Sequence, residues 1–348
     1  MSNIRNTTRI TRDWLAYASG WSINRIRKLS IGGTLILAYH RVLPESFIRH
    51  HPIMPGISVS TDAFTRQLEW LSARFKLVCI DDVVKGLSDS KPGDEPCCAI
   101  TFDDGWYDNY EFALPILEKY NAPTTIYIVL TTIGTAHASC FDKLFELLHS
   151  REPAAVFRCG ISRIDDLLDN RKMAVNDKFQ KVVGVARTIA PEQFRCLSNS
   201  ISQAYRSLSN WCELDSRYKM LGWPQMREMM SRGVSFGYHS KSHQSLPTLG
   251  QRELIDEIRF PEQEALMHGV TLQRHFCFPA GKYDLQTIRE LKDQGYRSAV
   301  SLDQGFNYVD TDPFILRRYN IHSGNSRVIP MLAHTIAKCS PIRLHSPN

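Results

Sequence analysis

Short apolar runs alternate with amphipathic stretches along most of the chain. The apolar runs, which predict buried strands, lie at residues 34–38, 77–80, 97–102, 124–130, 234–238, 275–278 and 298–302. The stretches with apolar residues three or four positions apart, which predict helices, lie at residues 60–75, 110–120, 224–232, 252–268 and 285–294. About seven strand–helix units predict an α/β fold with a largely parallel sheet, closed into a distorted (β/α) barrel.

One long segment, residues 134–221, departs from this alternation. It holds no strand-like run, and its apolar spacing predicts helices at residues 141–148, 164–168, 179–190 and 192–205. We therefore expect a mainly helical insertion at 134–221, within a barrel formed by residues 34–133 and 222–348.

Residues 1–33 form a third segment, which is basic and rich in aromatic residues. Over residues 9–28 it mixes Trp14, Tyr17 and Trp21 with several Arg and Lys side chains. Read as a helix, such a segment can make peripheral contact with an anionic membrane surface. Two other interpretations stay open, because the same pattern suits a helix packed on the outside of the barrel or a helix that binds a protein partner.

The composition is that of a globular protein and narrows the function classes. The chain has 348 residues, of which 43% are hydrophobic, and its net charge of +6 does not by itself indicate a nucleic-acid partner, so we expect none. The nine Cys include no CxxC pair, which argues against a disulfide framework and against a zinc ribbon. No apolar run of about 18 residues predicts a transmembrane helix. The N-terminus lacks the pattern of a signal peptide, so we expect a cytoplasmic protein, either free or held at the inner face of the membrane.

Two adjacent carboxylates, Asp103 and Asp104, follow the predicted strand 97–102 and precede Gly105. In α/β barrels the C-terminal ends of the strands carry the active site. A turn at this point can aim both side chains into one cleft, where one carboxylate binds a metal and the other stays free as a base. Taken alone, the pair is weak evidence for a catalytic site, because an Asp before Gly is also common where a helix starts.

Two histidines four residues apart, His239 and His243, follow the predicted strand 234–238. At this spacing both imidazoles can reach one cation, and Zn²⁺ accepts nitrogen from His together with carboxylate oxygen. A chance pair at this spacing is common among 12 His. The matching position of the Asp pair at another strand end favours a metal site.

Three spaced motifs resemble those of the NodB-like polysaccharide deacetylases (carbohydrate esterase family 4). The first two are TFDDG at residues 101–105 and HSKSH at 239–243, and the third is FCFPAGKY at 276–283. Tyr39, His40, Arg41 and Val42 also resemble the opening of the domain in members that modify exopolysaccharides. The resemblance spans about residues 34–133 and 222–322 and implies the NodB-like barrel.

The resemblance implies a role for each motif residue. Asp104, His239 and His243 would hold a divalent metal, commonly Zn²⁺, and Asp103 would be the general base that takes a proton from the attacking water. A backbone N–H at Ala280 would stabilise the oxyanion that forms on the substrate carbonyl.

The sequence departs from the family pattern where many relatives carry an Arg in the third motif. The segment 316–322 resembles the alternative arrangement, in which a later Arg pairs with the base, and this implies Arg318 in preference to Arg317. His322 is the candidate general acid by resemblance, and His40, at the same rim, is the other.

The aromatic residues Trp106, Tyr107 and Tyr283 follow strands and could stack on a sugar ring, although aromatic residues at such positions also serve in packing. We therefore expect metal-dependent removal of N-acetyl groups from a hexosamine-containing polysaccharide, oligosaccharide or glycolipid precursor. Two alternatives remain open: hydrolysis of another amide, cyclic or formyl, and carbohydrate binding without catalysis.

Overall fold

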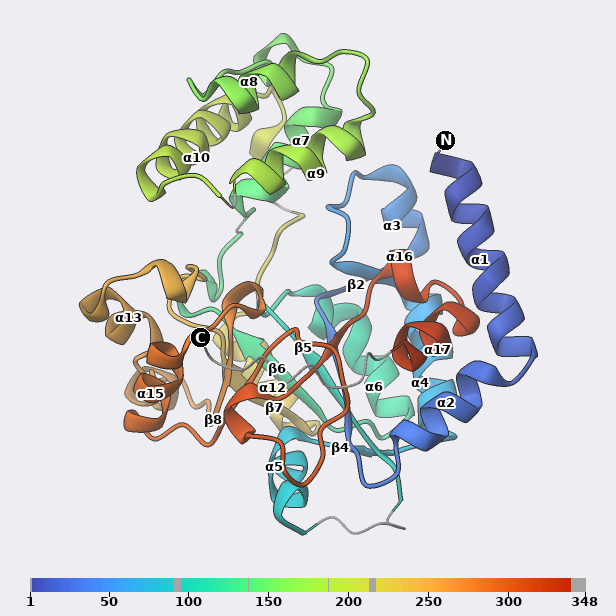
Figure 1. The fold of residues 1–348 in the computed structure, drawn as a ribbon. Helices are drawn as coiled ribbons and strands as arrows, with labels where there is room; N and C mark the ends of the chain where they lie inside the picture. Colours follow the sequence, from blue (N-terminus) through green and yellow to red (C-terminus); the bar gives the residue numbers. More distant parts are fainter. Residues whose placement is uncertain (1, 90–94, 137, 187, 213–216, 339–348) are drawn as a thin grey trace. The chain divides into compact units, whose positions relative to one another are not determined.

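The computed structural model describes residues 2–89, 95–136, 138–186, 188–212 and 217–338. The chain divides into two compact units (Figure 1). The first, here the barrel unit, consists of Met1–Glu45, Gly56–Thr135 and Met220–Asn348. The second, here the helical unit, consists of Ser46–Pro55 and Ala136–Lys219.

Eight described strands of the barrel unit form one sheet in the order β10-β1-β5-β6-β7-β8-β9, with β4 beside the first half of β5. Every pairing in this sheet is parallel. The strands are β1 (Leu35–Tyr39), β4 (Lys76–Val78), β5 (Cys97–Phe102), β6 (Thr124–Ile128), β7 (Val234–Tyr238), β8 (Leu272–Cys277), β9 (Ser298–Val300) and β10 (Tyr319–Asn320). A separate parallel pair joins β2 (Arg41–Leu43) to β3 (Ser58–Ser60).

The edges of the sheet meet through a short segment around Leu316. Leu316 bridges to Val300 in β9, and the Ser301 N–H donates to the Leu316 carbonyl at 2.8 Å. Three residues further on, β10 begins and pairs with β1, with Tyr319 opposite Leu37. The sheet therefore curls into a barrel that is closed by only a few contacts, and the predicted distorted (β/α) barrel is confirmed.

The strands are apolar because helices and the barrel interior cover both of their faces. All five residues of β1 and of β6 are buried, which is why these segments read as continuous apolar runs. The helices of the barrel unit are α1 (Ser2–Ala18), α2 (Trp21–Leu29), α4 (Thr61–Ser72), α5 (Ile80–Asp89), α6 (Leu114–Lys119), α12 (Trp223–Ser231), α13 (Gln251–Ile258), α14 (Glu262–Met267), α15 (Leu285–Asp293), α16 (Ser323–Ser326) and α17 (Ile329–Ala337).

Several elements differ from the sequence-based prediction. The single helix expected at 252–268 is wrong: α13 ends at Ile258 and α14 begins at Glu262, because Pro261 lacks the N–H that a continuous helix needs. The strand expected at 77–80 ends at Val78, and Ile80 already begins α5. A π-helix, Asn109–Ala113, precedes α6 where one α-helix was expected; such turns are frequent at functional sites.

The N-terminal helices α1 and α2 pack against α17 (Figure 1). Ile26 of α2 is buried in the main core, and the Tyr17 hydroxyl of α1 accepts a hydrogen bond from Trp70 Nε1 at 3.2 Å. None of the described helices is long and apolar enough to cross a membrane.

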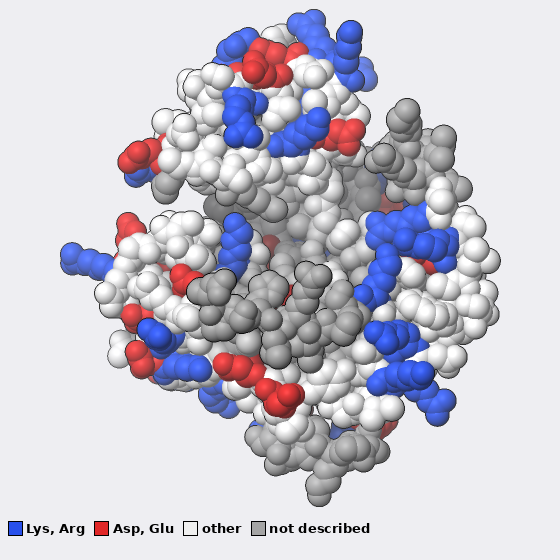
Figure 2. All heavy atoms as spheres, in the orientation of Figure 1, with Lys and Arg blue, Asp and Glu red and all other residues white. Residues whose placement is uncertain are grey.

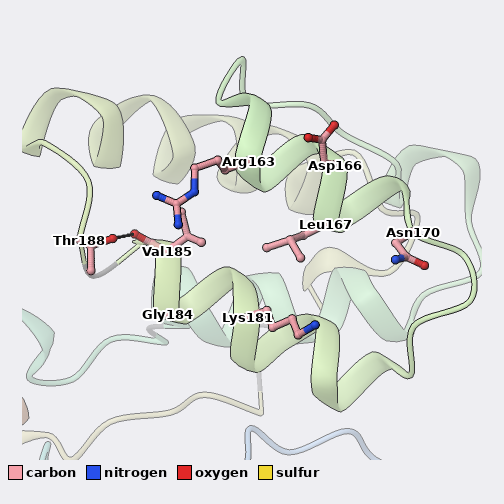
Figure 3. A pocket seen from close by; sticks show the side chains of 8 residues that line it. All are labelled: Arg163, Asp166, Leu167, Asn170, Lys181, Gly184, Val185 and Thr188. Atoms are coloured by element: carbon pink, nitrogen blue, oxygen red, sulfur yellow. Dashed lines mark hydrogen bonds between the residues drawn. The ribbon is translucent and has the colours of Figure 1, made fainter.

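The helical unit has a core of its own. Its helices are α7 (Cys140–His149), α8 (Ser162–Asp169), α9 (Val175–Ala186) and α10 (Pro191–Arg206), joined by residues 46–55, which include most of α3 (Glu45–His50). Leu144, Ile164, Val182 and Leu197 from the four helices are fully buried together. A surface groove of about 630 Å³ lies along α8 and α9 and is lined mainly by exposed side chains such as Arg163, Asp166 and Lys181 (Figure 3).

The chain leaves and re-enters the barrel unit at neighbouring positions. The Gly134 N–H donates to the Leu221 carbonyl at 2.9 Å, and the Met220 N–H donates to the Thr135 carbonyl at 2.9 Å. On the returning strand the Leu221 N–H donates to the Gly105 carbonyl at 2.8 Å, so this stem is bonded to the loop that follows β5.

Candidate active site

The C-terminal ends of four strands bring the predicted site residues together. The Asp103 N–H, just beyond β5, donates to the Tyr39 carbonyl at the end of β1, at 2.9 Å. The His239 N–H, just beyond β7, donates to the Ile128 carbonyl at the end of β6, at 2.8 Å. Parallel pairing thus fixes both loops at one end of the barrel, as expected for a barrel active site.

Three side chains direct possible ligand atoms at one point. Asp104 Oδ1 lies 3.4 Å from His239 Nε2 and 3.5 Å from His243 Nε2. One carboxylate oxygen and two imidazole nitrogens at this spacing could hold one metal ion, and they match the donor types of catalytic zinc sites, which leave a position open for water.

Neighbouring groups orient two of these ligands. His239 Nδ1 lies 2.7 Å from the Cys277 carbonyl, which can only accept a hydrogen bond, so Nδ1 carries a proton and Nε2 is the ring nitrogen that faces Asp104. Trp106 Nε1 donates to Asp104 Oδ2 at 3.0 Å, which leaves Oδ1 facing the histidines. These contacts therefore aim one nitrogen and one oxygen at the place where a cation could bind.

Backbone strain is concentrated at this site. Five described non-glycine residues have a positive φ, and four of them belong to the three motifs: Asp104 (74°), Ser240 (68°), His243 (61°) and Ala280 (53°). Residues in this region persist only where the surroundings fix them, and they cluster at functional sites. The left-handed turn at Asp104 separates the directions of the two adjacent carboxylates.

A buried carboxylate, Glu257 of α13, holds the loop that carries His243. Glu257 is 4% exposed and accepts hydrogen bonds from the Ser242 N–H at 2.9 Å and from Gln244 Nε2 at 3.0 Å, and a further one from the Ser242 hydroxyl. Within the loop, Ser240 Oγ accepts from the His243 N–H at 2.9 Å. These bonds hold the loop that carries His243.

Asp103 lies beside this cluster and forms a buried bidentate pair with Arg318. Arg318 Nη1 and Nη2 donate to the two Asp103 oxygens at 2.7 and 2.8 Å. The guanidinium also donates to the Ser301 carbonyl, to Thr101 Oγ1 and to Cys277 Sγ. The contact expected of Arg318 is thus present, whereas the Arg317 N–H donates to Asn307.

The charges around the carboxylates keep both ionised. Burial raises the pKa of Asp103, but the charge and hydrogen bonds of Arg318 outweigh it, and the net pKa lies below the usual value. Burial also raises the pKa of Asp104, and the hydrogen bond to His239 with the nearby His40 and His243 lowers it well below the usual value.

The pKa values of the two histidines in this cluster are shifted in opposite directions. Desolvation of its ring nitrogens and the charge of His239 lower the pKa of His243 to about 4, so it is neutral at pH 7. Burial lowers the pKa of His239, but Cys277 and the two carboxylates outweigh burial and raise it. A proton on His239 balances the negative charge of this cluster, and a bound cation would replace it.

A second set of possible ligand atoms comprises Asp103, His239 and Cys277. Both Asp103 oxygens and Cys277 Sγ already accept hydrogen bonds from Arg318, and the guanidinium charge would repel a cation there. The residues Asp104, His239 and His243 fit a metal better.

The two candidate acids have different surroundings. His322 Nδ1 accepts a hydrogen bond from the Gly324 N–H at 3.1 Å and caps α16. Burial, with the charges of Arg9 and His40, lowers the pKa of His322 to about 4, which leaves it neutral at pH 7. His40 has a buried Nδ1 with no described partner, and it is close enough to Asp103, Asp104 and His243 to affect the pKa of each.

His40 is held by a network that the sequence reading missed. Asn109 Nδ2 donates to the His40 carbonyl at 2.8 Å, and the buried pair Arg41–Asp108 joins the same two loops at 2.7 Å. Arg41 and Asp108 follow the ends of β1 and β5, but no spacing in the sequence relates them.

The remaining candidates line the rim or support it. No described residue accepts a hydrogen bond from the Ala280 N–H, and Ala280 has a positive φ of 53°. Tyr283 is stacked on Phe278 with ring centroids 4.9 Å apart, and its hydroxyl donates to Asp303 at 2.6 Å. One face of its ring is therefore already covered.

Trp106 does not occupy the rim position that the sequence suggested. It is 4% exposed, and the Arg41 guanidinium covers its ring at 4.4 Å. The expectation that Trp106 stacks on a sugar is therefore corrected, because a buried ring offers no face to substrate. Its position identifies it as a residue that orients Asp104.

The chain resembles known proteins in both sequence and fold. The sequence profile described as Polysaccharide deacetylase matches residues 90–299. YxkH of Bacillus subtilis, which is described as a polysaccharide deacetylase, is 31% identical over 286 residues, or 80% of this chain and 72% of its own. The poly-beta-1,6-N-acetyl-D-glucosamine N-deacetylase of Staphylococcus epidermidis is 21% identical over 223 residues, or 62% of this chain and 75% of its own.

Two solved structures share the fold. The Streptococcus pyogenes deacetylase PplD has a TM-score of 0.54 at 17% identity and covers 87% of this chain and 98% of its own. IcaB from Ammonifex degensii has a TM-score of 0.54 at 18% identity and covers 88% of this chain and 98% of its own. Because the family profile spans more than half of the chain and YxkH is similar over most of it, the chain belongs to the polysaccharide deacetylases, hydrolases that act on carbon–nitrogen bonds.

Proposed function

We propose that this protein removes N-acetyl groups from hexosamine residues of a polysaccharide, an oligosaccharide or a glycolipid precursor, with the aid of a divalent metal. The observation that carries the proposal is the convergence of Asp104, His239 and His243 beside the ionised Asp103. A cation held there would polarise the amide carbonyl and acidify a bound water. Zn²⁺ is the first choice, because two nitrogens and one carboxylate oxygen suit it.

Residues of the chain itself would remove the proton from the attacking water and stabilise the oxyanion. Asp103, held by Arg318, takes a proton from the attacking water. The free Ala280 N–H donates a hydrogen bond to the oxygen that becomes negatively charged as the carbonyl is attacked. Both groups are fixed before substrate arrives, so little reorganisation opposes the reaction.

His40 is our candidate for protonation of the leaving amine. The Nδ1 of His322 is occupied by the cap of α16, and its lowered pKa of about 4 leaves it without a proton to give at pH 7. His40 lies within electrostatic range of both carboxylates, and its buried Nδ1 has no described hydrogen-bond partner.

The test is acetate release by the purified protein, stripped with a chelator and reloaded with Zn²⁺. Oligomers of β-1,6-linked N-acetylglucosamine are the first substrate, as the name of the Staphylococcus epidermidis relative suggests. Asp103→Asn and His40→Gln are each expected to lower the rate roughly 100- to 10,000-fold. Asp166→Asn, an exposed change in α8, is the matched control and should keep the full rate.

Each negative outcome points to a different conclusion. Full activity of Asp103→Asn, with metal content unchanged, would rule out Asp103 as the general base. Full activity without metal would rule out metal dependence. Release of formate or opening of a cyclic amide, without release of acetate, would indicate another amidohydrolase, and sugar binding without any turnover would indicate a non-catalytic relative.

A further inference from the structure

Nearly all of the net charge of the protein lies in its first 30 residues. These contain six of the 42 Lys and Arg residues and one of the 36 Asp and Glu residues, so they carry five of the six net positive charges. The other 318 residues are close to neutral. The catalytic site does not account for this concentration of charge.

One side of this segment is fixed to the barrel unit. Besides the bond between Tyr17 and Trp70, Asp13 lies 3.5 Å from His334 of α17, and the Leu29 carbonyl accepts a hydrogen bond from the Tyr308 hydroxyl at 2.9 Å. The interpretation of packing on the barrel therefore holds for this side. Because these contacts fix α1 and α2 on the barrel unit, they also determine which residues of the two helices face outward.

The outward side, here the N-terminal face, combines large apolar side chains with cations. Trp14 is 51% exposed, Leu15 66% and Trp21 47%. Ile10, Trp14 and Ala18 are four residues apart and so lie on one side of α1. The cations on this face are Arg9, Arg12, Arg27 and Lys28, all exposed.

The N-terminal face displays no described acid. Asp13 is 2% exposed and accepts hydrogen bonds from Arg12. Figure 2 shows Lys and Arg side chains gathered over the part of the barrel unit where α1, α2 and α17 lie, with few Asp or Glu among them. Exposed Trp and Leu beside cations are the pattern of a helix that lies in a lipid headgroup layer.

We propose that the N-terminal face docks on an anionic phospholipid bilayer. The cations would contact lipid phosphates, and Trp14, Leu15 and Trp21 would enter the boundary between headgroups and acyl chains. The charge favours this partner, because a neutral apolar protein surface would desolvate Arg9, Arg27 and Lys28 without offering them an acceptor.

The docked face adjoins the catalytic end of the barrel. Arg9 of α1 is close enough to His322, at the end of β10, for its charge to act on that imidazole. α1 packs on α17, and α17 packs on α16, which His322 caps. If the proposed deacetylase function holds, a saccharide attached to a lipid would meet the site at the surface where the enzyme is bound.

Flotation of the full chain with vesicles tests the docking without any assay of activity. We expect binding to vesicles of phosphatidylcholine with about one-third phosphatidylglycerol, and little binding to phosphatidylcholine alone. Binding should weaken as salt rises, and the emission of exposed Trp should shift to shorter wavelength on binding. Equal binding to both vesicle types, or to neither, would overturn the proposal.

Two sets of variants separate the N-terminal face from net charge and from general apolar exposure. Arg9→Gln, Arg27→Gln and Lys28→Gln together should weaken binding about 100-fold. Arg163→Gln, Arg171→Gln and Lys172→Gln, three exposed cations of the helical unit, remove the same charge and should leave binding within about twofold.

A second double variant, with a matched control, tests how much the exposed apolar side chains contribute to vesicle binding. Trp14→Ala with Leu15→Ala should weaken binding at least about tenfold, whereas Val156→Ala with Met267→Ala, which are exposed elsewhere, should not. Equal losses in the matched variants would overturn the assignment to this face. Thermal unfolding of each variant excludes misfolding as the cause, and acetate release can be intact or absent without affecting the result.

Discussion

Asp104 has two carboxylate oxygens, and each has a different partner. Oδ1 faces the two histidines and Oδ2 accepts the Trp106 indole N–H, so the indole determines which oxygen is offered to a cation. Partners of this kind commonly change metal affinity by 10- to 100-fold, about 1–3 kcal/mol, although they never touch the metal. Trp106 therefore acts through Asp104.

Trp106→Phe isolates this hydrogen bond. The phenyl ring can still lie under Arg41, but Asp104 Oδ2 loses its donor and the carboxylate can rotate. Zn²⁺ affinity, measured by competition with a chromophoric chelator, is expected to fall about 10- to 100-fold.

Trp70→Phe is the matched control. Trp70 is also buried, donates from Nε1 to Tyr17, and has the Arg74 guanidinium 4.6 Å above its ring, but it lies away from the ligands. An equal loss of affinity in both variants would mean that Trp106 acts only through general packing.

At the scale of elements, the short helix α16 depends on a candidate site residue, His322, for its cap, so the protonation of that residue affects the free energy of unfolding. His322 caps it by accepting the Gly324 N–H on Nδ1, and a proton on that nitrogen would abolish the cap. The free histidine titrates near 6.5, whereas burial and nearby charges lower the pKa of His322 to about 4 in the folded protein.

The sign of the pH dependence follows from this lowered pKa. Below about pH 6.5 the unfolded chain binds a proton that the folded chain does not, so the free energy of unfolding falls as pH drops from about 6.5 to about 4. His322→Asn keeps a side-chain oxygen for the cap and removes the titration. Urea unfolding at several pH values across this range gives the number of protons taken up on unfolding. In His322→Asn this number should be smaller than in the unchanged protein, by up to about one. His50→Asn, an exposed histidine, should not change the slope, and an unchanged slope in His322→Asn would contradict the argument.

Most strands of the sheet could be predicted from the sequence, whereas some helix boundaries could not. Continuous apolar runs located the strands, because strands buried on both faces leave that pattern. The strand ends in turn located Asp103, Asp104, His239 and His243. The break at Pro261 and the π-helix after Asp108 depend on local backbone bonds, which periodicity alone does not encode.

Contacts between distant segments were harder to foresee. Arg318 reaches Asp103 because β10 lies next to β1, and only the resemblance to known deacetylases indicated that pairing. Glu257 and Asn109 are ordinary polar residues in helical stretches, and their roles arise from the loops they contact. The burial of Trp106 was misjudged, since an aromatic residue after a strand can face either way.

At the scale of the whole molecule, the two units have separate cores. Leu197 of α10 is fully buried among side chains of the helical unit only. Leu197→Ala should lower the free energy of unfolding of that unit by about 2–5 kcal/mol and leave the Zn²⁺ affinity of the barrel unit unchanged.

The comparison is Leu68→Ala, which creates a cavity in the core beside β1 and β5 and should destabilise the barrel unit instead. Urea unfolding followed by circular dichroism, together with metal titration, distinguishes the two. Loss of Zn²⁺ affinity in Leu197→Ala under native conditions would show that the units fold as one.

The stem between Thr135 and Met220 has an evolutionary consequence. Its two strands are hydrogen-bonded to each other, so the 84 residues from Ala136 to Lys219 begin and end at the same place. A short turn could join the two strands there without changing the order of any strand in the sheet. A lineage could therefore gain, exchange or lose this segment in a single genetic event, while the loop after β5 stayed under independent selection for chemistry.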